Sequence, residues 1–172
     1  MYKKSILKVG DVVFFNNDGS FVSWAISLFT KSQFTHVGIV YEIKDDVITL
    51  AEALASGFTK KDYSVDSFFK RVNKSKFVLK RASNISTKSV KDTIDMLEGR
   101  PYGFLDLLRI AVYKLTGKRM GGDSTRFLIC SEAVAIVLRN ANNKIDLSKE
   151  KNKPMSYISP ADIFHSKHLK FV

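Results

Sequence analysis

The stretch that decides the fold reads Arg126-Phe127-Leu128-Ile129-Cys130-Ser131-Glu132-Ala133-Val134-Ala135-Ile136-Val137-Leu138. Its apolar residues recur three and four positions apart, which predicts a helix that begins near Cys130. Asp123 and Ser124 are available upstream as caps, and the asparagines of residues 140–143 supply a stop. A thiol in the first turn meets unsatisfied backbone N–H groups and the positive end of the helix dipole, which both favour the thiolate. The pattern indicates a nucleophilic cysteine, whereas a lone cysteine elsewhere is usually a small buried apolar residue.

Length and composition bound the class of protein. The chain has 172 residues, of which 45% are hydrophobic and 26% charged, so we expect one globular domain over residues 1–172. The single cysteine excludes an intramolecular disulfide framework. With only three histidines beside it, we expect no structural zinc site and no metal or other cofactor.

The sequence carries no segment that points to a membrane or to secretion. The basic residues 1–7 are followed by Gly10-Asp11 before an apolar core of signal-peptide length develops. No run reaches the roughly 18 apolar residues of a membrane span. We therefore expect no transmembrane segment and a protein that is either cytoplasmic or released without a signal peptide.

The positive charge is unevenly distributed. The net charge is +11, and residues 60–126, here called the basic belt, hold 16 Lys and Arg against 7 Asp and Glu. Such a belt suits contact with an anionic polymer or a membrane surface, although a solvated lysine-rich surface explains it equally well. No aromatic–basic motif accompanies the charge, so we predict no specific nucleic-acid partner. We also expect the protein to be a monomer.

A hairpin is predicted from two β-branched runs. Residues 32–42 and 47–54 read as strands that are joined by a turn at residues 44–46. If the turn centres on position 44 or 45, position 36 falls opposite position 52 or 54. His36 and Glu52 are then cross-strand or diagonal neighbours, whereas a register one residue away places Glu52 on the other face.

The remaining elements follow from turn residues and periodicity. Before the hairpin we expect a buried strand within residues 8–15 and a helix over 21–31. After it we expect an irregular segment over 55–75 with a short helix near 65–71, a strand over 76–81, a helix that opens at Ser86 and runs to 97, and a second amphipathic helix over 104–115. The rest of the chain should contain a flexible joint at 121–123, a charged loop over 144–153, a helix that begins at Ser159-Pro160, and an edge strand over 169–172.

Six motifs follow one another along the chain. They are Val9-Gly10-Asp11-Val12-Val13-Phe14-Phe15, Phe34-Thr35-His36-Val37-Gly38-Ile39-Val40, Ala51-Glu52-Ala53, Glu98-Gly99-Arg100-Pro101-Tyr102-Gly103-Phe104, Ile129-Cys130-Ser131-Glu132 and Ser159-Pro160-Ala161-Asp162. Their kind and order resemble the permuted branch of the NlpC-type papain-fold superfamily, in pattern most of all its YiiX-like hydrolases and more distantly the lecithin:retinol acyltransferase-like proteins. The resemblance implies an α+β fold: a circularly permuted papain-like domain whose antiparallel sheet or barrel packs against the helix that bears the cysteine.

The resemblance also implies site residues. Cys130 would be the nucleophile, His36 the general base and then acid, and Glu52 the acceptor that orients the imidazole. The backbone N–H of Cys130 and a second donor, Tyr102 or Ser131, would stabilise the oxyanion.

Two other glutamates are alternatives for the third member of the triad. Glu42 lies on the same predicted strand as His36, and Glu132 lies on the helix of the cysteine itself. We favour Glu52 over both.

Three functions are compatible with these residues. The first is a thiol hydrolase that cuts an amide bond, as in cell-wall peptides or peptidoglycan, through a thioester. The second is a lipid acyltransferase, thioesterase or phospholipase that uses the same triad on an acyl lipid, with Phe58, Phe68, Phe69 and the helix over 104–115 as an acyl groove. The third is a non-enzymatic basic binding module. Residues 55–76 carry no motif of the family, so the sequence assigns no substrate specificity.

Overall fold

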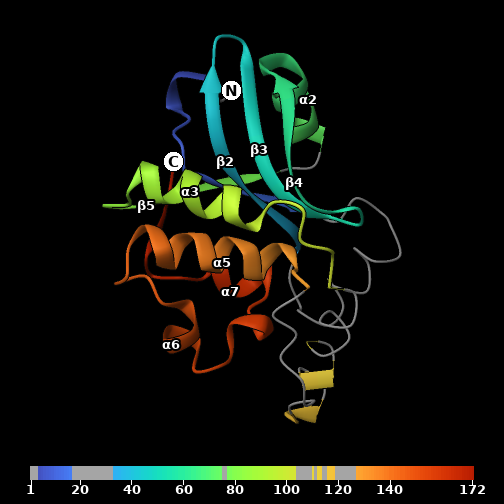
Figure 1. The fold of residues 1–172 in the computed structure, drawn as a ribbon, viewed down its shortest axis with the longest axis vertical. Helices are drawn as coiled ribbons and strands as arrows, with labels where there is room; N and C mark the ends of the chain where they lie inside the picture. The colour runs from blue at the N-terminus through green and yellow to red at the C-terminus, as the bar shows by residue number, and fades with distance from the viewer. Residues whose placement is uncertain are drawn as a thin grey trace.

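The structure, a computed structural model, describes residues 4–16, 33–74, 77–103, 110, 112–113, 116–118 and 127–172. These residues form an α+β fold built on an open antiparallel sheet of six strands in the order β4-β3-β2-β1-β5-β6 (Figure 1). The strands are β1 (Val12–Asn16), β2 (Phe34–Lys44), β3 (Val47–Leu54), β4 (Gly57–Ser64), β5 (Val78–Ala82) and β6 (Leu169–Phe171). The predicted hairpin, the strand before it and the C-terminal edge strand are therefore all present.

Five α-helices and two short 3₁₀ helices are described. They are α2 (Val65–Lys74), α3 (Thr87–Leu97), α5 (Cys130–Ala141), α6 (Leu147–Lys151), α7 (Pro160–Phe164), η1 (Lys4–Ile6) and η2 (Met155–Tyr157). The predicted starts are confirmed for α3, where the Ser86 side chain accepts from the backbone N–H of Ser89, and for α5, which begins at Cys130. Ser159 caps α7 in a capping box, with Pro160 in the first turn, as predicted.

The centre of the sheet, around β1, is buried on both faces. Val12 and Phe14 face the core beneath α3 and α5, which lie side by side across the sheet in Figure 1. Val13 and Phe15, which alternate with them, face a second core that contains Phe68 of α2. Because both faces are covered, β1 reads as a continuous apolar run rather than an alternating one.

Two segments differ from expectation. Residues 57–64, predicted to be irregular, form strand β4, and the predicted charged loop contains helix α6. Strand β4 lies at the edge of the sheet and is polar after Phe58, so it lacks the apolar alternation that identifies a strand. Helix α6 is short, and its start is fixed by Asp146, whose side chain accepts from the backbone N–H groups of Ser148 and Lys149.

Some predictions fall outside the described residues. These are the helix over 21–31, the joint at 121–123 and the two suggested caps, Asp123 and Ser124. Of the second amphipathic helix, residues 110, 112 and 113 are described, and they are helical. The residue that precedes α5 is Ile129, which has extended backbone and contributes no side-chain cap.

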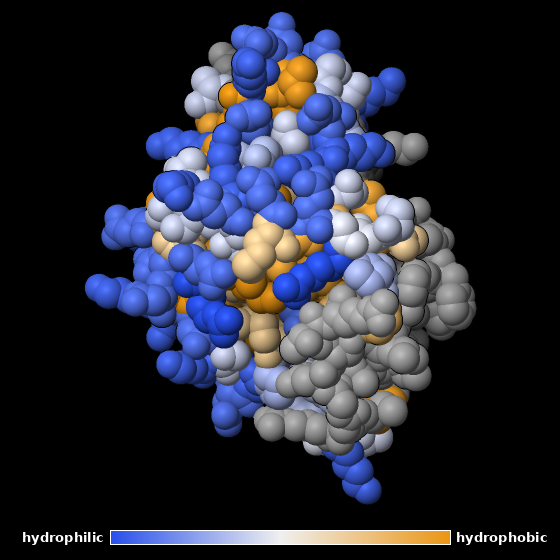
Figure 2. Space-filling model, viewed as in Figure 1, coloured by the Kyte–Doolittle hydropathy of each residue, from blue (hydrophilic) through white to orange (hydrophobic). Residues whose placement is uncertain are grey.

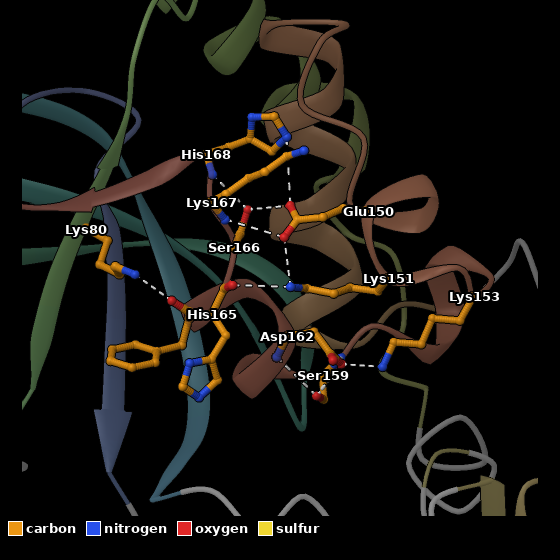
Figure 3. A network of polar contacts seen from close by, with 11 residues as sticks. Lys80, Glu150, Lys151, Lys153, Ser159, Asp162, His165, Ser166, Lys167 and His168 are labelled. Atoms are coloured by element: carbon orange, nitrogen blue, oxygen red, sulfur yellow. Dashed lines mark hydrogen bonds and ion pairs between the residues drawn. The ribbon is translucent and has the colours of Figure 1, made fainter.

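Polar contacts hold the C-terminal segment in place (Figure 3). Asp162 of α7 accepts from the Lys153 ammonium at 2.6 Å and from the Ser159 backbone N–H at 2.8 Å. Glu150 of α6 accepts from the Ser166 hydroxyl at 2.7 Å. From the sheet, the Lys80 ammonium donates to the carbonyl of Phe164. These contacts fix α6 and α7 against one another and against β5.

None of the helices in the described part of the chain combines the length and the apolar composition that crossing a bilayer requires.

Candidate active site

The β2–β3 hairpin brings His36 and Glu52 together. Gly38 pairs with Glu52, so His36, two residues earlier on β2, lies diagonally across from the carboxylate on the same face. The Nε2 atom of His36 is 2.8 Å from Oε2 of Glu52. This diagonal contact is one of the two arrangements that the sequence allowed.

A β-bulge gives the hairpin this register. Next to the turn, Lys44 pairs with Val47, and an unbroken continuation of that register would place Glu52 opposite Ile39, on the face away from His36. The register instead shifts by one residue between Val40 and Glu42. The bulge is therefore the reason that a two-residue turn is compatible with a His36–Glu52 contact.

The Glu52 side chain has 0% exposure, so its charge needs partners inside the protein. One carboxylate oxygen, Oε2, is taken by His36, and the other, Oε1, accepts from the hydroxyl of Tyr63 at 2.8 Å. Tyr63 lies on β4, and our sequence analysis did not identify it. Ser56-Gly57 is a turn signal that indicates a β3–β4 hairpin, but the turn residues are Ala55 and Ser56, and this position of the turn pairs Tyr63 with Ile48.

Cys130 is the first residue of α5, and only 3% of it is exposed. Its side chain interacts with the imidazole of His36. Burial alone lowers the pKa of His36, but hydrogen bonds and charge interactions with Cys130 and Glu52 outweigh burial and raise this pKa to about 10. His36 is therefore an imidazolium at neutral pH, held between a sulfur and a carboxylate, with 21% of its side chain exposed.

The two candidate oxyanion donors have different surroundings. Tyr102 forms a parallel β-bridge with Leu128, two residues before the cysteine. Burial and, after it, the charge of Cys130 raise the pKa of Tyr102, which keeps the phenol protonated and able to donate. The Ser131 hydroxyl is buried and donates to the carbonyl of Ile158 at 2.6 Å, so it joins α5 to the residue after η2.

The two alternative glutamates do not make the contact that Glu52 makes with His36. Glu42 lies beyond the bulge and accepts from the ammonium of Lys91 on α3 at 2.6 Å. Glu132 lies in the first turn of α5, after Cys130. The described polar contacts of the imidazole are those with Glu52 and Cys130, and the ring of Phe15 packs beside it with 5.6 Å between centroids.

Part of the basic belt is neutralised within the molecule. The Lys60 ammonium lies 2.7 Å from Asp95 and 2.8 Å from Glu98, and Lys88 lies 2.6 Å from Asp92. The face in Figure 2 is nonetheless mostly hydrophilic around a small apolar area. Within the described ranges, no three His, Cys, Asp or Glu side chains are grouped so that they could hold a metal ion.

No family model matches the sequence, and no curated protein matches it. Among solved structures, the fold is similar to that of the metalloprotein YiiX from Escherichia coli O157:H7, with a TM-score of 0.65 and 21% sequence identity over 96% of each chain. At this identity the similarity concerns the fold alone. The chain has a YiiX-like α+β fold.

Proposed function

We propose that the protein is a cysteine hydrolase of the permuted NlpC-type papain-fold superfamily, which cuts an amide bond with Cys130, His36 and Glu52. The observation that carries the proposal is that one imidazole interacts with both the cysteine and a fully buried carboxylate. A buried salt bridge would explain His36 and Glu52 alone, but it would not require a cysteine at a helix start on the other side of the ring.

The chemistry follows from the two sides of the imidazole. Nε2 faces Glu52, which leaves Nδ1 to exchange a proton with Cys130 and the substrate. The thiolate attacks the carbonyl carbon, a C–S bond forms, and the imidazolium gives its proton to the leaving amine as the C–N bond breaks. Water then attacks the thioester carbon while His36 accepts one of its protons; the C–S bond breaks, the carboxylic acid is released, and the thiolate–imidazolium pair is regenerated.

The tetrahedral intermediate carries a negative oxygen that needs donors. The backbone N–H of Cys130, in the first turn of α5, supplies one, and we assign the second to the Tyr102 hydroxyl. Each such donor typically stabilises the transition state by about 3 kcal/mol.

An amide substrate is favoured over an acyl lipid by the positions of two aromatic residues. Phe58 and Phe68 are 2% and 0% exposed and fill the two cores, so they do not line an acyl groove. The excess of Lys and Arg over Asp and Glu in the basic belt suits peptides attached to an anionic wall polymer.

YiiX is described as a metalloprotein, but the donor set here does not fit a metal ion. The described residues hold no group of three or more His, Cys, Asp or Glu side chains suited to one.

The pH dependence of Cys130 alkylation by iodoacetamide, followed by intact mass, tests the proposal. The single cysteine makes the signal unambiguous. We expect the wild type to react at about pH 6, and H36A to react appreciably only as the pH approaches about 8.5. H165A, which alters an exposed histidine, is the matched control and should behave as the wild type.

Equally slow alkylation of the wild type and H36A would refute the activated cysteine. If the wild type shows the low-pH reactivity, peptidoglycan fragments and acyl amides are the substrates to screen, with C130A as the inactive reference. Cleavage of acyl lipids in place of amides would replace the first substrate class with the second.

A further inference from the structure

We infer that Tyr63 is a positioning residue of the site, whose hydroxyl holds the Glu52 carboxylate in place for His36. The inference rests on the proposed function and extends the triad to a fourth group. Tyr63 does not contact the reacting atoms in this scheme, and it acts through Glu52.

The two oxygens of Glu52 have separate partners. Oε2 lies 2.8 Å from the His36 ring nitrogen, and Oε1 accepts from the Tyr63 hydroxyl at 2.8 Å. The carboxylate is thus held from two neighbouring strands, β2 and β4, while its own backbone belongs to the strand between them. A carboxylate that is held at both oxygens has little freedom to rotate away from the imidazole.

The strand register shows that Tyr63 must reach along the sheet to make this contact. Tyr63 pairs with Ile48, four residues before Glu52 on β3, whereas the residue directly opposite Glu52 is Thr59. The phenol and the glutamate side chain extend toward each other and together bridge this separation. Its ring is supported by an edge contact with Phe68 of α2, at 6.4 Å between ring centroids.

The support of Tyr63 links α2 to the catalytic groups. Phe68 has 0% exposure and belongs to the core under this face of the sheet. Residues 55–76 have no recognisable motif in the sequence, and this contact gives the segment a role: β4 and α2 carry and brace the group that fixes Glu52.

The charged and titratable groups around Glu52 come from three elements. Strand β2 contributes His36, strand β4 contributes Tyr63, and Cys130 of α5 meets the far side of the imidazole. The ammonium of Lys61, also on β4, lies 5.5 Å from the centre of the Tyr63 ring. Helix α2 adds the apolar Phe68.

A buried carboxylate that loses a donor is protonated more easily, and the imidazolium then loses its counter-charge.

The Tyr63→Phe variant tests this inference because it removes the hydroxyl and keeps the ring that packs on Phe68. We expect iodoacetamide alkylation of Cys130 to be about tenfold slower at about pH 6 than in the wild type, and to recover at alkaline pH. The matched control is Tyr41→Phe, which removes a hydroxyl from β2 whose acceptor is the exposed Asp95 at 3.4 Å. Its pH profile should equal that of the wild type.

A double-mutant comparison separates positioning from a general structural effect. If Tyr63 acts through Glu52, adding Y63F to E52Q produces no further slowing. A Y63F profile equal to that of the wild type, or a Y63F effect that is undiminished in the E52Q background, overturns the inference. Failure of the proposed function looks different, because the wild type itself would then lack the reactivity at low pH.

A measurement on the wild type covers the case in which Y63F does not fold. The hydroxyl proton of Tyr63 should exchange slowly with water in NMR spectra, and faster in E52Q. A hydroxyl proton that exchanges as fast as that of an exposed tyrosine, or that E52Q leaves unchanged, also overturns the inference.

Discussion

Tyr102 and Ser131 are both polar residues close to Cys130 in the chain or in the fold, and their contacts separate their roles. The Ser131 hydroxyl is committed to the Ile158 carbonyl, whereas Tyr102 lies within electrostatic range of Cys130. A donor to the oxyanion matters only in a reaction that forms one, and alkylation by iodoacetamide does not. The two residues can therefore be told apart by comparing two reactions of the same cysteine.

We predict that Y102F lowers kcat/KM on a cleavable amide by about 100-fold, equivalent to about 3 kcal/mol, and leaves the alkylation profile of Cys130 unchanged. The comparison of amide turnover with alkylation in one protein preparation checks this. S131A is the control: it should destabilise the fold by about 1 kcal/mol in urea unfolding, because a buried carbonyl loses its donor, and retain turnover. Equal losses in both reactions for Y102F would assign Tyr102 a structural role.

At the scale of elements, the capping box of α7 contains a buried charge pair. Asp162 and Lys153 are 14% and 6% exposed and 2.6 Å apart. Burial alone raises the pKa of Asp162, but Lys153 and Ser159 more than offset it and lower this pKa below its usual 3.8. A carboxyl group with a lowered folded-state pKa stabilises the protein above the unfolded-state value, and this stabilisation is lost as the pH falls through the folded-state value.

We predict that D162N reduces the free energy of unfolding by about 3 kcal/mol at neutral pH, because the Lys153 ammonium stays buried without its counter-charge. The deficit should shrink as the pH falls below 3.8, where the wild type also loses the charge. Urea unfolding of both proteins at neutral pH and at about pH 3 measures it. D92N, which breaks an exposed pair with Lys88, serves as the control and should cost at most about 0.5 kcal/mol.

The hairpin shows what could and could not be predicted at this scale. The two β-branched runs were sufficient to predict β2 and β3 and to make His36 and Glu52 neighbours in one register. The bulge was not predicted. It follows from packing, since Val40 and Ile43 both contact the same core although they are three residues apart, and an unbroken strand alternates with a period of two.

Side-chain patterns did not single out Tyr63, because the polar edge strand β4 has no apolar face after Phe58, and the Ser56-Gly57 turn signal suggests a hairpin without fixing its register. Strand β4 is held in the sheet by backbone hydrogen bonds to β3, and a pattern of side chains does not reveal such bonds. The contact between Tyr63 and Glu52 therefore lies in a segment whose sequence shows little apolar periodicity.

At the scale of the whole molecule, alternation and helical periodicity predicted the β2–β3 hairpin and several helices, whereas the α+β class was implied by the resemblance to a family. The contact of Cys130 with His36 could not be predicted from the spacing of residues. The two residues are far apart in the sequence, and no spacing rule connects them. They meet because α5 packs on β2 and β3. Helix α7, which the polar contacts of Figure 3 hold in place, packs against both β2 and α5. Only the resemblance to a family suggested this pairing in advance.

Because this contact joins a helix to the sheet, its charge state should affect global stability. The pKa of His36 is raised from 6.5 to about 10 by Cys130 and Glu52, after the opposing effect of burial. A group whose folded-state pKa is raised stabilises the protein fully below its unfolded-state value, and this stabilisation is lost as the pH rises through the folded-state value. The contribution of His36 should therefore decrease between pH 6.5 and about pH 10.

We predict that the free energy of unfolding of the wild type falls more steeply over this interval than that of H36Q, so that the two values converge toward about pH 10. Urea titrations at several pH values measure both slopes, and H165A should keep the slope of the wild type. Parallel curves for the wild type and H36Q would mean that the imidazole does not gain its proton on folding. The charge pair would then be absent from the resting protein, and the cysteine would have to be activated only when substrate binds.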